Sequence, residues 1–146
     1  MINTLIEFVF VPLHVGFLLF IGYNIFRADK SAFDWMKGKI EKLNEDTTRM
    51  YHRHVSYGLL GMIVTGIVMF IPLREKLLAS NAFAIKMALV LVLIINSVVI
   101  DKHIKVATEK SFAELTTKER LPLLISGAVS TICWLSILVA VAFLPE

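Results

Sequence analysis

The sequence predicts an all-α integral membrane protein, folded as an antiparallel four-helix bundle with helical extensions on the cytoplasmic side. Of the 146 residues, 57% are hydrophobic and 18% are charged, and the mean hydropathy is +0.74, unlike the composition of soluble domains. Charges are missing from 8–26, 54–73 and 121–145, and Lys86 alone interrupts 77–100. About 20 apolar residues in a helix span the hydrocarbon core of a bilayer. The whole chain is therefore expected to form one domain that crosses the lipid bilayer four times.

The first span and the loop that follows it carry two local signals. Pro12 removes one backbone hydrogen bond, which predicts a kink in the first span. Apolar side chains then recur at helical spacings of three and four among the charges of the loop. These residues are Phe33, Trp35, Met36, Ile40 and Leu43. The first span is therefore expected to continue as a helical extension.

Cap and turn signals set the limits of the spans. The polar cluster 44–47 is typical of a helix start, and it places the next helix near Thr47 or Thr48. The helix of the third span is expected to run past the membrane to residue 118, and Pro122 then suits the first turn of the last helix. The spans are expected at about 3–26, 50–72, 78–101 and 121–144.

Lysine and arginine collect in two of the connections between spans. Residues 27–53 and 101–120 hold most of them, whereas the opposite side has only Arg74 and Lys76. By the positive-inside tendency, both termini are expected outside the cytoplasm, with a bacterial inner membrane as the location. The basic loops predict contacts with anionic lipids, and no nucleic-acid partner is expected.

Three ionisable residues inside the spans mark a predicted polar cluster near the outer end of the bundle. Glu7 and His14 are seven residues apart, so they lie within about 20° of one helical face. Lys86 lies at a matching depth on the third span. Charges inside a bilayer are costly. The cluster is therefore expected to be either a proton or substrate site or a buried ion pair between Glu7 and Lys86.

Further histidines lie near the cytoplasmic boundary. His52 and His54 are about 200° apart around a helix, so only one of them is expected to point into the bundle. His54 is the expected one, because it shares its face with a stripe of small residues. The stripe consists of Gly58, Gly61 and Thr65. It either lets a neighbouring helix approach closely or leaves room for a flat ligand.

Haem b is the cofactor predicted for this region. Haem requires axial donors on opposite sides of a planar ring, small residues beside the ring and cations for its propionates. In an antiparallel pair of helices, the third span would bring His103 opposite the first turn of the second span. The predicted set is His54 and His103 as ligands, Gly58 and Gly61 beside the ring, and Arg53 and Lys102 for the propionates.

Two alternatives to this single haem site remain open. His14 lies about 19 Å from the cytoplasmic boundary and would serve a separate outer haem, with a methionine from the second or third span as the other donor. Copper or zinc would instead be held at the cytoplasmic end. The methionines are Met62, Met69 and Met87, and the metal ligands would be His52 or His54 with His103 and Asp101.

A family resemblance rests on three phrases of the sequence. These are PLHVGFLLFIG in the first span, HVSYGLLGMIVTGIVMF in the second and AFAIKMALVLVLI in the third. The chain resembles small four-span membrane proteins related to copper-resistance protein D and to the J-type haem-binding protoporphyrinogen oxidase. The resemblance implies a first-span histidine, here His14, and a third-span lysine within K-x-x-L-V-L, here Lys86.

The expected function is that of a haem-binding redox protein, similar to a b-type cytochrome in electron transfer, with membrane oxidoreductase activity as an open question. The expected partners are a redox protein or a quinone-like substrate, together with a homodimer or a larger complex. The alternatives are a copper or zinc protein, a permease component and a structural or interaction subunit without a ligand.

Overall fold

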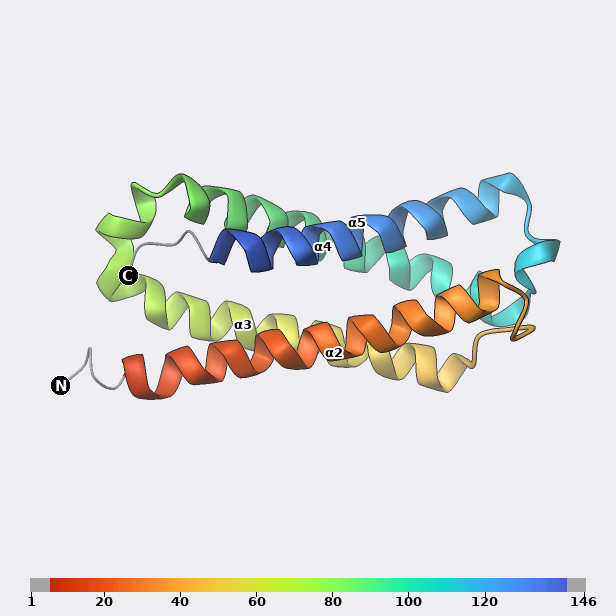
Figure 1. Cartoon of the computed structure of the whole chain (residues 1–146), viewed down its shortest axis with the longest axis horizontal. Coiled ribbons are helices and arrows are strands. Elements are labelled where there is room, and N and C mark those ends of the chain that lie inside the picture. Colours follow the sequence, from red (N-terminus) through yellow and green to blue (C-terminus); the bar gives the residue numbers. More distant parts are fainter. Residues whose placement is uncertain (1–5, 142–146) are drawn as a thin grey trace.

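The computed structural model describes residues 6–141, and every regular element within that range is helical. The elements are the π-helical turn η1 (Ile6–Phe10), α2 (Val11–Met36), α3 (Glu45–Leu78), α4 (Asn81–Glu109), the short η2 (Phe112–Glu114) and α5 (Thr117–Val141). The long helices run antiparallel to their neighbours in sequence (Figure 1). Each of them is long and apolar enough to cross a membrane. The predicted all-α, four-helix architecture is confirmed.

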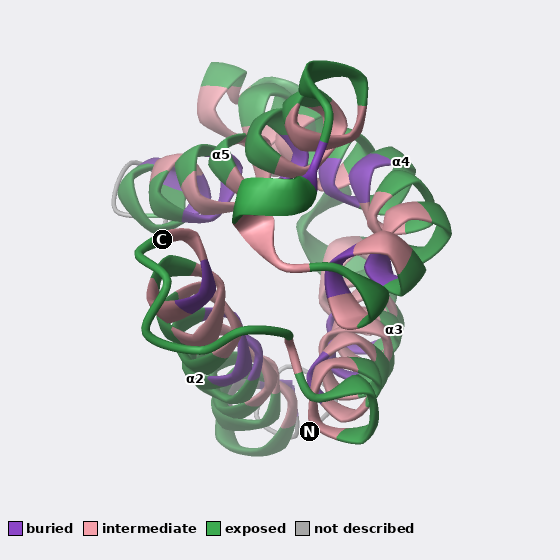
Figure 2. Ribbon diagram, turned by 90° about the vertical axis from the view of Figure 1, so that its right-hand side faces the viewer, coloured by how far each residue is buried: buried purple, intermediate pink, exposed green. Residues whose placement is uncertain are grey.

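The bundle consists of two closely packed helix pairs. α2 packs along α3 and α4 packs along α5, with a smaller contact between α3 and α4. Seen along the bundle, buried residues lie mainly on the sides of the helices that face its interior (Figure 2). The core between the pairs is formed by Ile21, Ile25, Met62, Leu93, Cys133, Trp134 and Ile137. Many other large apolar side chains are exposed, as on a surface that contacts a membrane.

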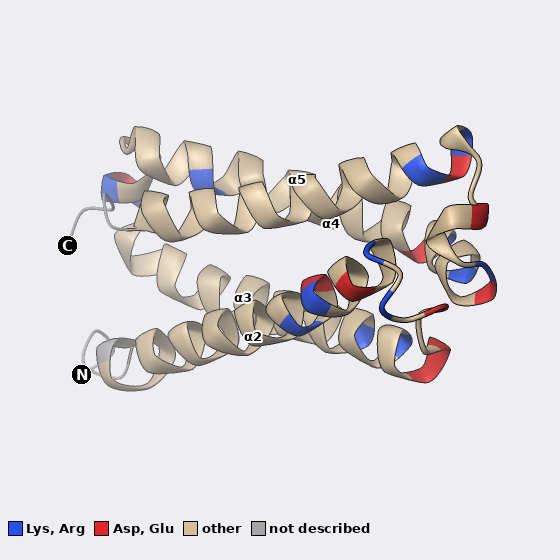
Figure 3. Cartoon of the chain, turned by 45° about the vertical axis from the view of Figure 1, so that its right-hand side comes forward, with Lys and Arg blue, Asp and Glu red and all other residues tan. Residues whose placement is uncertain are grey.

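The two ends of the bundle differ in charge. Most lysine, arginine, aspartate and glutamate residues lie at the end that carries the connections 37–44 and 110–116 (Figure 3). We call this the basic end. At the opposite end, the turn end, α2 begins, α5 ends and α3 turns into α4 through Ala79 and Ser80.

Two helices stop earlier than the sequence predicts. α2 ends at Met36 rather than continuing through Leu43, because Gly38 adopts a positive φ of 70° that leaves the helical path. The helix of the third span was expected to reach residue 118. That helix, α4, ends at Glu109, because Lys110 is extended and η2 follows.

Two helices begin earlier than predicted, and side-chain caps explain both starts. α3 begins at Glu45, since Asn44 Oδ1 accepts a hydrogen bond of 2.8 Å from the Thr47 amide. α5 begins at Thr117, well ahead of Pro122. Glu119 accepts hydrogen bonds from the Thr116 amide and hydroxyl, each 2.9 Å long.

Pro12 coincides with a change in helix type. It lies in the first turn of α2, immediately after the π-helical turn η1. The backbone N–H that proline lacks would have no partner within the helix at this position, so a proline is tolerated in the first turn. The π turn before it is a local departure from regular α-helical geometry. The irregularity predicted near Pro12 is thus a π turn before it, at the turn end of the bundle.

A second, smaller core fixes the connections at the basic end. It contains the buried residues Trp35, Ala107 and Leu115. Trp35 donates a hydrogen bond of 3.2 Å from Nε1 to the Lys110 carbonyl, and its ring packs edge-on against Phe112 at 5.2 Å. The end of α2 is thereby held against the end of α4 and η2.

Candidate functional site

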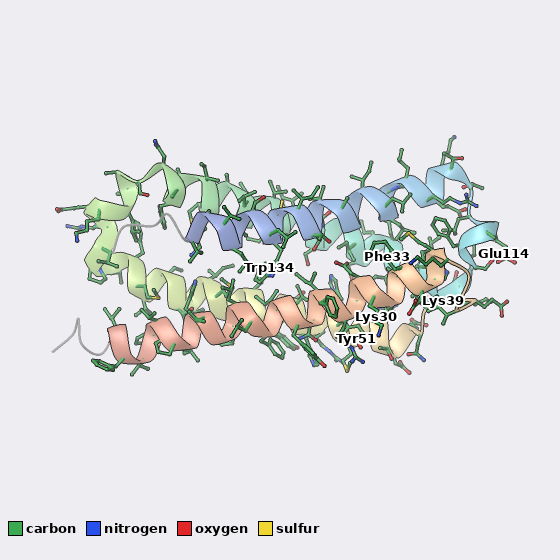
Figure 4. The ribbon with its side chains drawn as sticks, viewed as in Figure 1. Lys30, Phe33, Lys39, Tyr51, Glu114 and Trp134 are labelled. Carbon is green, nitrogen blue, oxygen red and sulfur yellow. The ribbon has the colours of Figure 1, made fainter. Side chains whose placement is uncertain are left out.

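Two cavities lie inside the bundle, one above the other along its axis. The turn-end cavity has a volume of about 430 Å³ and the basic-end cavity about 140 Å³. Leu59, Leu93 and Trp134 line both. Trp134 projects from α5 into the space between α5 and α2 (Figure 4), where a Cβ on Gly22 would lie 3.0 Å from its Nε1. A single layer of side chains therefore separates the two cavities.

The turn-end cavity is almost entirely apolar. His14 comes from α2, most of the wall comes from α3 and α4, and Trp134 and Ile137 come from α5. His14 and Lys86 are its ionisable residues. The remaining residues of the wall are Leu59, Met62, Ile63, Gly66, Ile67, Met69, Phe70, Leu73, Leu77, Phe83, Met87, Val90 and Leu93.

Thr65 orients the imidazole of His14. The Thr65 hydroxyl donates to the Gly61 carbonyl at 2.8 Å, within its own helix. His14 Nδ1 lies 2.7 Å from Thr65 Oγ1. Since the hydroxyl proton is committed to Gly61, the consistent arrangement is that Nδ1–H of His14 donates to Thr65. The lone pair of the neutral imidazole is then on Nε2, as a metal ligand requires.

Lys86 brings a cation to the same cavity. Its side chain is half-buried on α4, in a wall that is otherwise apolar apart from His14. The sequence placed His14 and Lys86 in one polar cluster, and both line this cavity. The third member, Glu7, has a side chain outside the part of the chain that the structure describes, so the Glu7–Lys86 ion pair stays a prediction.

The turn-end cavity has two stacked phenylalanine rings in its wall and is open toward the outer surface of the helices. Phe70 and Phe83 stack across α3 and α4 with their ring centroids 5.6 Å apart and their planes 14° apart. Two other residues of the wall, Ile67 on α3 and Met87 on α4, are 58% and 49% exposed. The opening between them faces the surroundings of the bundle.

The methionines named as donors toward His14 all lie in this wall. Met62 and Met69 on α3 and Met87 on α4 line the turn-end cavity together with His14. Met62 is buried, whereas Met87 is exposed at the opening. The thioether groups are therefore distributed over two helices around one apolar space.

The wall of the basic-end cavity contains more polar residues than that of the turn-end cavity, although both walls expose mainly apolar surface. Its wall includes Asp29 of α2 and Tyr51 and His52 of α3, with Asn96 and Ser97 of α4. His52 Nε2 lies 3.2 Å from the Ser97 carbonyl, and its Nδ1 lies 3.9 Å from Asp101 Oδ1.

Asp29 is a residue of this wall that the sequence did not predict, because it lies beyond the charge-free stretch of the first span and was assigned to the loop. Asp29 lies one helical turn before Phe33, in the expected helical extension, and this spacing was the sequence signal that could have identified it.

The expectation that only one of His52 and His54 turns toward the bundle is wrong. His52 lines the basic-end cavity between α3 and α4. His54 faces α2 instead. Its Nδ1 lies 3.1 Å from Asn24 Oδ1, and its ring lies 5.6 Å from that of Phe20. Both are half-buried, because the closely packed α2 covers the face that an isolated helix would expose.

The stripe of small residues contacts α2 closely. A Cβ on Gly58 would collide with Ile21, and one on Gly61 would lie 2.5 Å from the Phe17 ring. Of the two alternatives for this stripe, close helix packing is the one present in the structure. Side chains of α2 fill the space that a flat ligand beside Gly58 and Gly61 would need.

The other predicted ligands at the basic end lie apart from both cavities. His103 Nδ1 lies 2.8 Å from the Val99 carbonyl of its own helix, and neither His54 nor His103 lines a cavity. Arg53 and Lys102 are exposed on α3 and α4. Among residues 6–141, as far as their side chains are described, no three of His, Cys, Asp and Glu come together in a group that could hold a metal ion.

Comparisons of the chain with protein-family models, curated proteins and solved structures find no match.

Proposed function

We propose that the protein is an integral membrane protein that binds haem b in the turn-end cavity, where His14 would hold the iron. The observation that carries the proposal is the contact of 2.7 Å between His14 and Thr65 in the wall of a cavity that also contains Lys86. A hydrogen bond that fixes one ring nitrogen, as Thr65 fixes Nδ1 of His14, is the usual support of a metal-ligating imidazole.

Membrane insertion follows from the surface of the helices. All four long helices meet the length and hydropathy of a membrane span, and their outward faces carry many exposed apolar side chains. α3 contains 34 residues and measures about 51 Å, longer than a hydrocarbon core of about 30 Å. Its charged first turns therefore project beyond the bilayer. The positive-inside tendency supports a cytoplasmic basic end, with both termini outside.

The residues of the turn-end cavity fit haem in their chemistry. The volume of about 430 Å³ lies within the range of small-molecule sites. His14 offers an imidazole nitrogen, Lys86 offers a cation for a propionate, and Met62 or Met69 offers a thioether as a second donor. When bound, haem would supply reversible one-electron transfer. The apolar wall would keep water away from it and thereby influence its potential.

The lateral opening supports a redox partner that dissolves in the membrane. Ile67 and Met87 are exposed on the outward surface of the bundle, which in a membrane faces lipid. The stacked rings of Phe70 and Phe83 lie in the wall of the same cavity. A quinone-like substrate would therefore reach the cavity from the bilayer. Electron transfer to such a substrate, with or without a further protein partner, is the activity that we propose.

Haem titration of the protein in lipid nanodiscs tests the site. The wild type is expected to bind one haem per chain, with an absorption band that changes on reduction. His14→Ala should abolish that band, whereas His54→Ala and His103→Ala, which remove the predicted basic-end ligands, should leave it unchanged. Loss of the band in the latter two variants, with binding retained in His14→Ala, would overturn the assignment. Colourless protein that retains stoichiometric copper or zinc would favour the small-metal alternative.

A further inference from the structure

The basic-end cavity is a second chamber, separate from the proposed haem site, and its mainly apolar wall carries a few polar and ionisable groups. It joins a carboxyl group from α2 and an imidazole from α3, Asp29 and His52, within one space of about 140 Å³. Such a space has room for several water molecules, and the side chains of Asp29, His52 and Ser97 in its wall offer them hydrogen-bond partners. Ionisable groups that line a cavity between apolar helices are expensive to maintain and commonly mark a pathway or a site.

Asp29 has hydrogen-bond partners suited to both of its protonation states. The Thr131 hydroxyl on α5 lies 2.9 Å from Asp29 Oδ2 and 3.1 Å from the Gly127 carbonyl. When Asp29 is ionised, the hydroxyl donates to the carboxylate. When Asp29 is protonated, the acid donates to Thr131 and the hydroxyl proton turns to Gly127. Rotation of one hydroxyl therefore accommodates the gain or loss of a proton.

His52 connects this cavity to solvent. Its Nε2 lies 3.2 Å from the Ser97 carbonyl and 3.4 Å from the Ser97 hydroxyl, so the ring is held against α4 on that side. Nδ1 lies 3.9 Å from Asp101 Oδ1, and the Asp101 side chain is 61% exposed. An exposed carboxylate, a half-buried imidazole and the cavity thus follow one another from the surface inward.

The other charged or titratable groups near the cavity have defined partners. On α3, Tyr51 lines the cavity and its Oη accepts a hydrogen bond of 3.3 Å from Arg27 Nε on α2. From α5, the described wall residues are Gly127, Ser130 and Trp134, none of which titrates in the ordinary pH range. Asp29 and His52 are therefore the groups of this wall that we consider for proton exchange with solvent.

We propose that the basic-end cavity is a hydrated proton-binding site. A proton from bulk water enters along Asp101 and His52 and protonates the carboxylate of Asp29, and it returns by the same route. The site stores the proton one side-chain layer away from the turn-end cavity, behind Leu59, Leu93 and Trp134. The proposal is independent of haem, because every group in it belongs to the chain.

Trp134 offers a direct readout, since it lines the cavity and is one of only two tryptophans in the chain. With Trp35→Phe as background, Trp134 emission is recorded in ligand-free nanodiscs from about pH 3 to pH 9, across the ordinary carboxyl and imidazole ranges. Emission is expected to follow a titration that is lost in Asp29→Asn. Asp34→Asn, which removes an aspartate paired at 3.4 Å with Lys39 at the surface, should retain it. A titration that survives in Asp29→Asn, or emission that does not change with pH, would overturn the proposal.

Infrared difference spectra of the protein without the Trp35→Phe change give a second test. A protonated-carboxyl band should appear on acidification and be missing in Asp29→Asn; its persistence in that variant counts against the site. The route is tested by a pH jump, in which His52→Gln keeps an amide donor for the Ser97 carbonyl but cannot carry a proton. The Trp134 response should slow while its end point stays the same, and an unchanged rate would exclude His52 from the path.

Discussion

Asn96 and Ser126 exchange two hydrogen bonds across the interface between α4 and α5. Asn96 Nδ2 donates to the Ser126 carbonyl, and the Ser126 hydroxyl donates to Asn96 Oδ1, each at 2.8 Å. Both residues are buried. The second bond joins the side chains themselves, so the polar groups of both are satisfied within the contact between the two helices.

Removal of this pair should loosen the α4–α5 contact. In a double-mutant cycle of Asn96→Ala and Ser126→Ala, the two residues should show a coupling energy of about 0.6 kcal/mol, the average for hydrogen bonds between membrane helices, and at most about 1.7 kcal/mol. Unfolding in mixed detergent micelles gives the four free energies. Ser126→Ala combined with Ser130→Ala is the matched control and should be additive. A coupling near zero for Asn96 and Ser126 would contradict the geometry.

Glycine substitutions should separate packed from open positions on the helices. Gly61→Ala places a methyl group against the Phe17 ring, and such overpacking costs typically about 1–3 kcal/mol of unfolding free energy. Gly16→Ala has nothing within 4 Å of its new Cβ and should be neutral or slightly stabilising, because alanine favours helix over glycine. Thermal or detergent unfolding measures both. Equal effects of the two substitutions would show that α2 does not approach α3 at Gly61.

Thr65 should control haem affinity through the orientation of His14. Thr65→Val keeps the shape of the side chain but removes the acceptor of the His14 Nδ1–H, so haem should bind about 10–100-fold more weakly, as for other partners of metal-ligating histidines. Thr65→Ser retains the hydroxyl and should bind nearly as the wild type does. Haem titration gives the affinities. This prediction depends on the proposed haem site. Equal haem affinities of the Thr65→Val and Thr65→Ser variants would show that Thr65 serves packing alone.

The connection between α4 and α5 should respond to acid through Glu114. The Ser111 amide donates to Glu114 Oε2 at 3.0 Å, and this bond, followed by the Ser111 hydroxyl, lowers the pKa of Glu114 below 4.5. A lowered pKa in the folded state means that the interaction contributes fully above pH 4.5 and is lost as the pH falls through the lower folded value. The NMR shift of the Ser111 amide should therefore titrate with a midpoint below 4.5. Glu114→Gln should abolish that titration and Glu109→Gln should leave it; a midpoint at or above 4.5 would contradict the bond.

The helix ends show which boundaries the local sequence can predict and which it cannot. The polar cluster around Asn44 predicted the start of α3 to within a few residues, because capping depends on the residues beside the helix end. The end of α4 was misplaced, since the apolar residues beyond Glu109 continue a helical spacing while the chain turns into η2. There Trp35, a residue distant in sequence, binds the Lys110 carbonyl and holds the turn.

The partners of the histidines depended on packing. Spacing alone gave the angle between His52 and His54, but it could not tell how α3 is rotated relative to α2 and α4. In the folded chain His52 faces Ser97 and His54 faces Asn24. The pairing of His14 with Thr65 joins residues that are 51 positions apart, so no local pattern could have revealed it.

The sequence by itself determined that four long apolar helices form and that charge collects at one end of them. Hydropathy, helix length and charge are properties of consecutive residues, so they can be predicted without knowing which helices pack against one another. Only the tertiary structure decided that His14 and Lys86 share one cavity, that Asp29 and His52 share another, and that Gly58 and Gly61 lie against α2. These relationships depend on how each helix is rotated about its axis, which is set by side chains packing across the bundle.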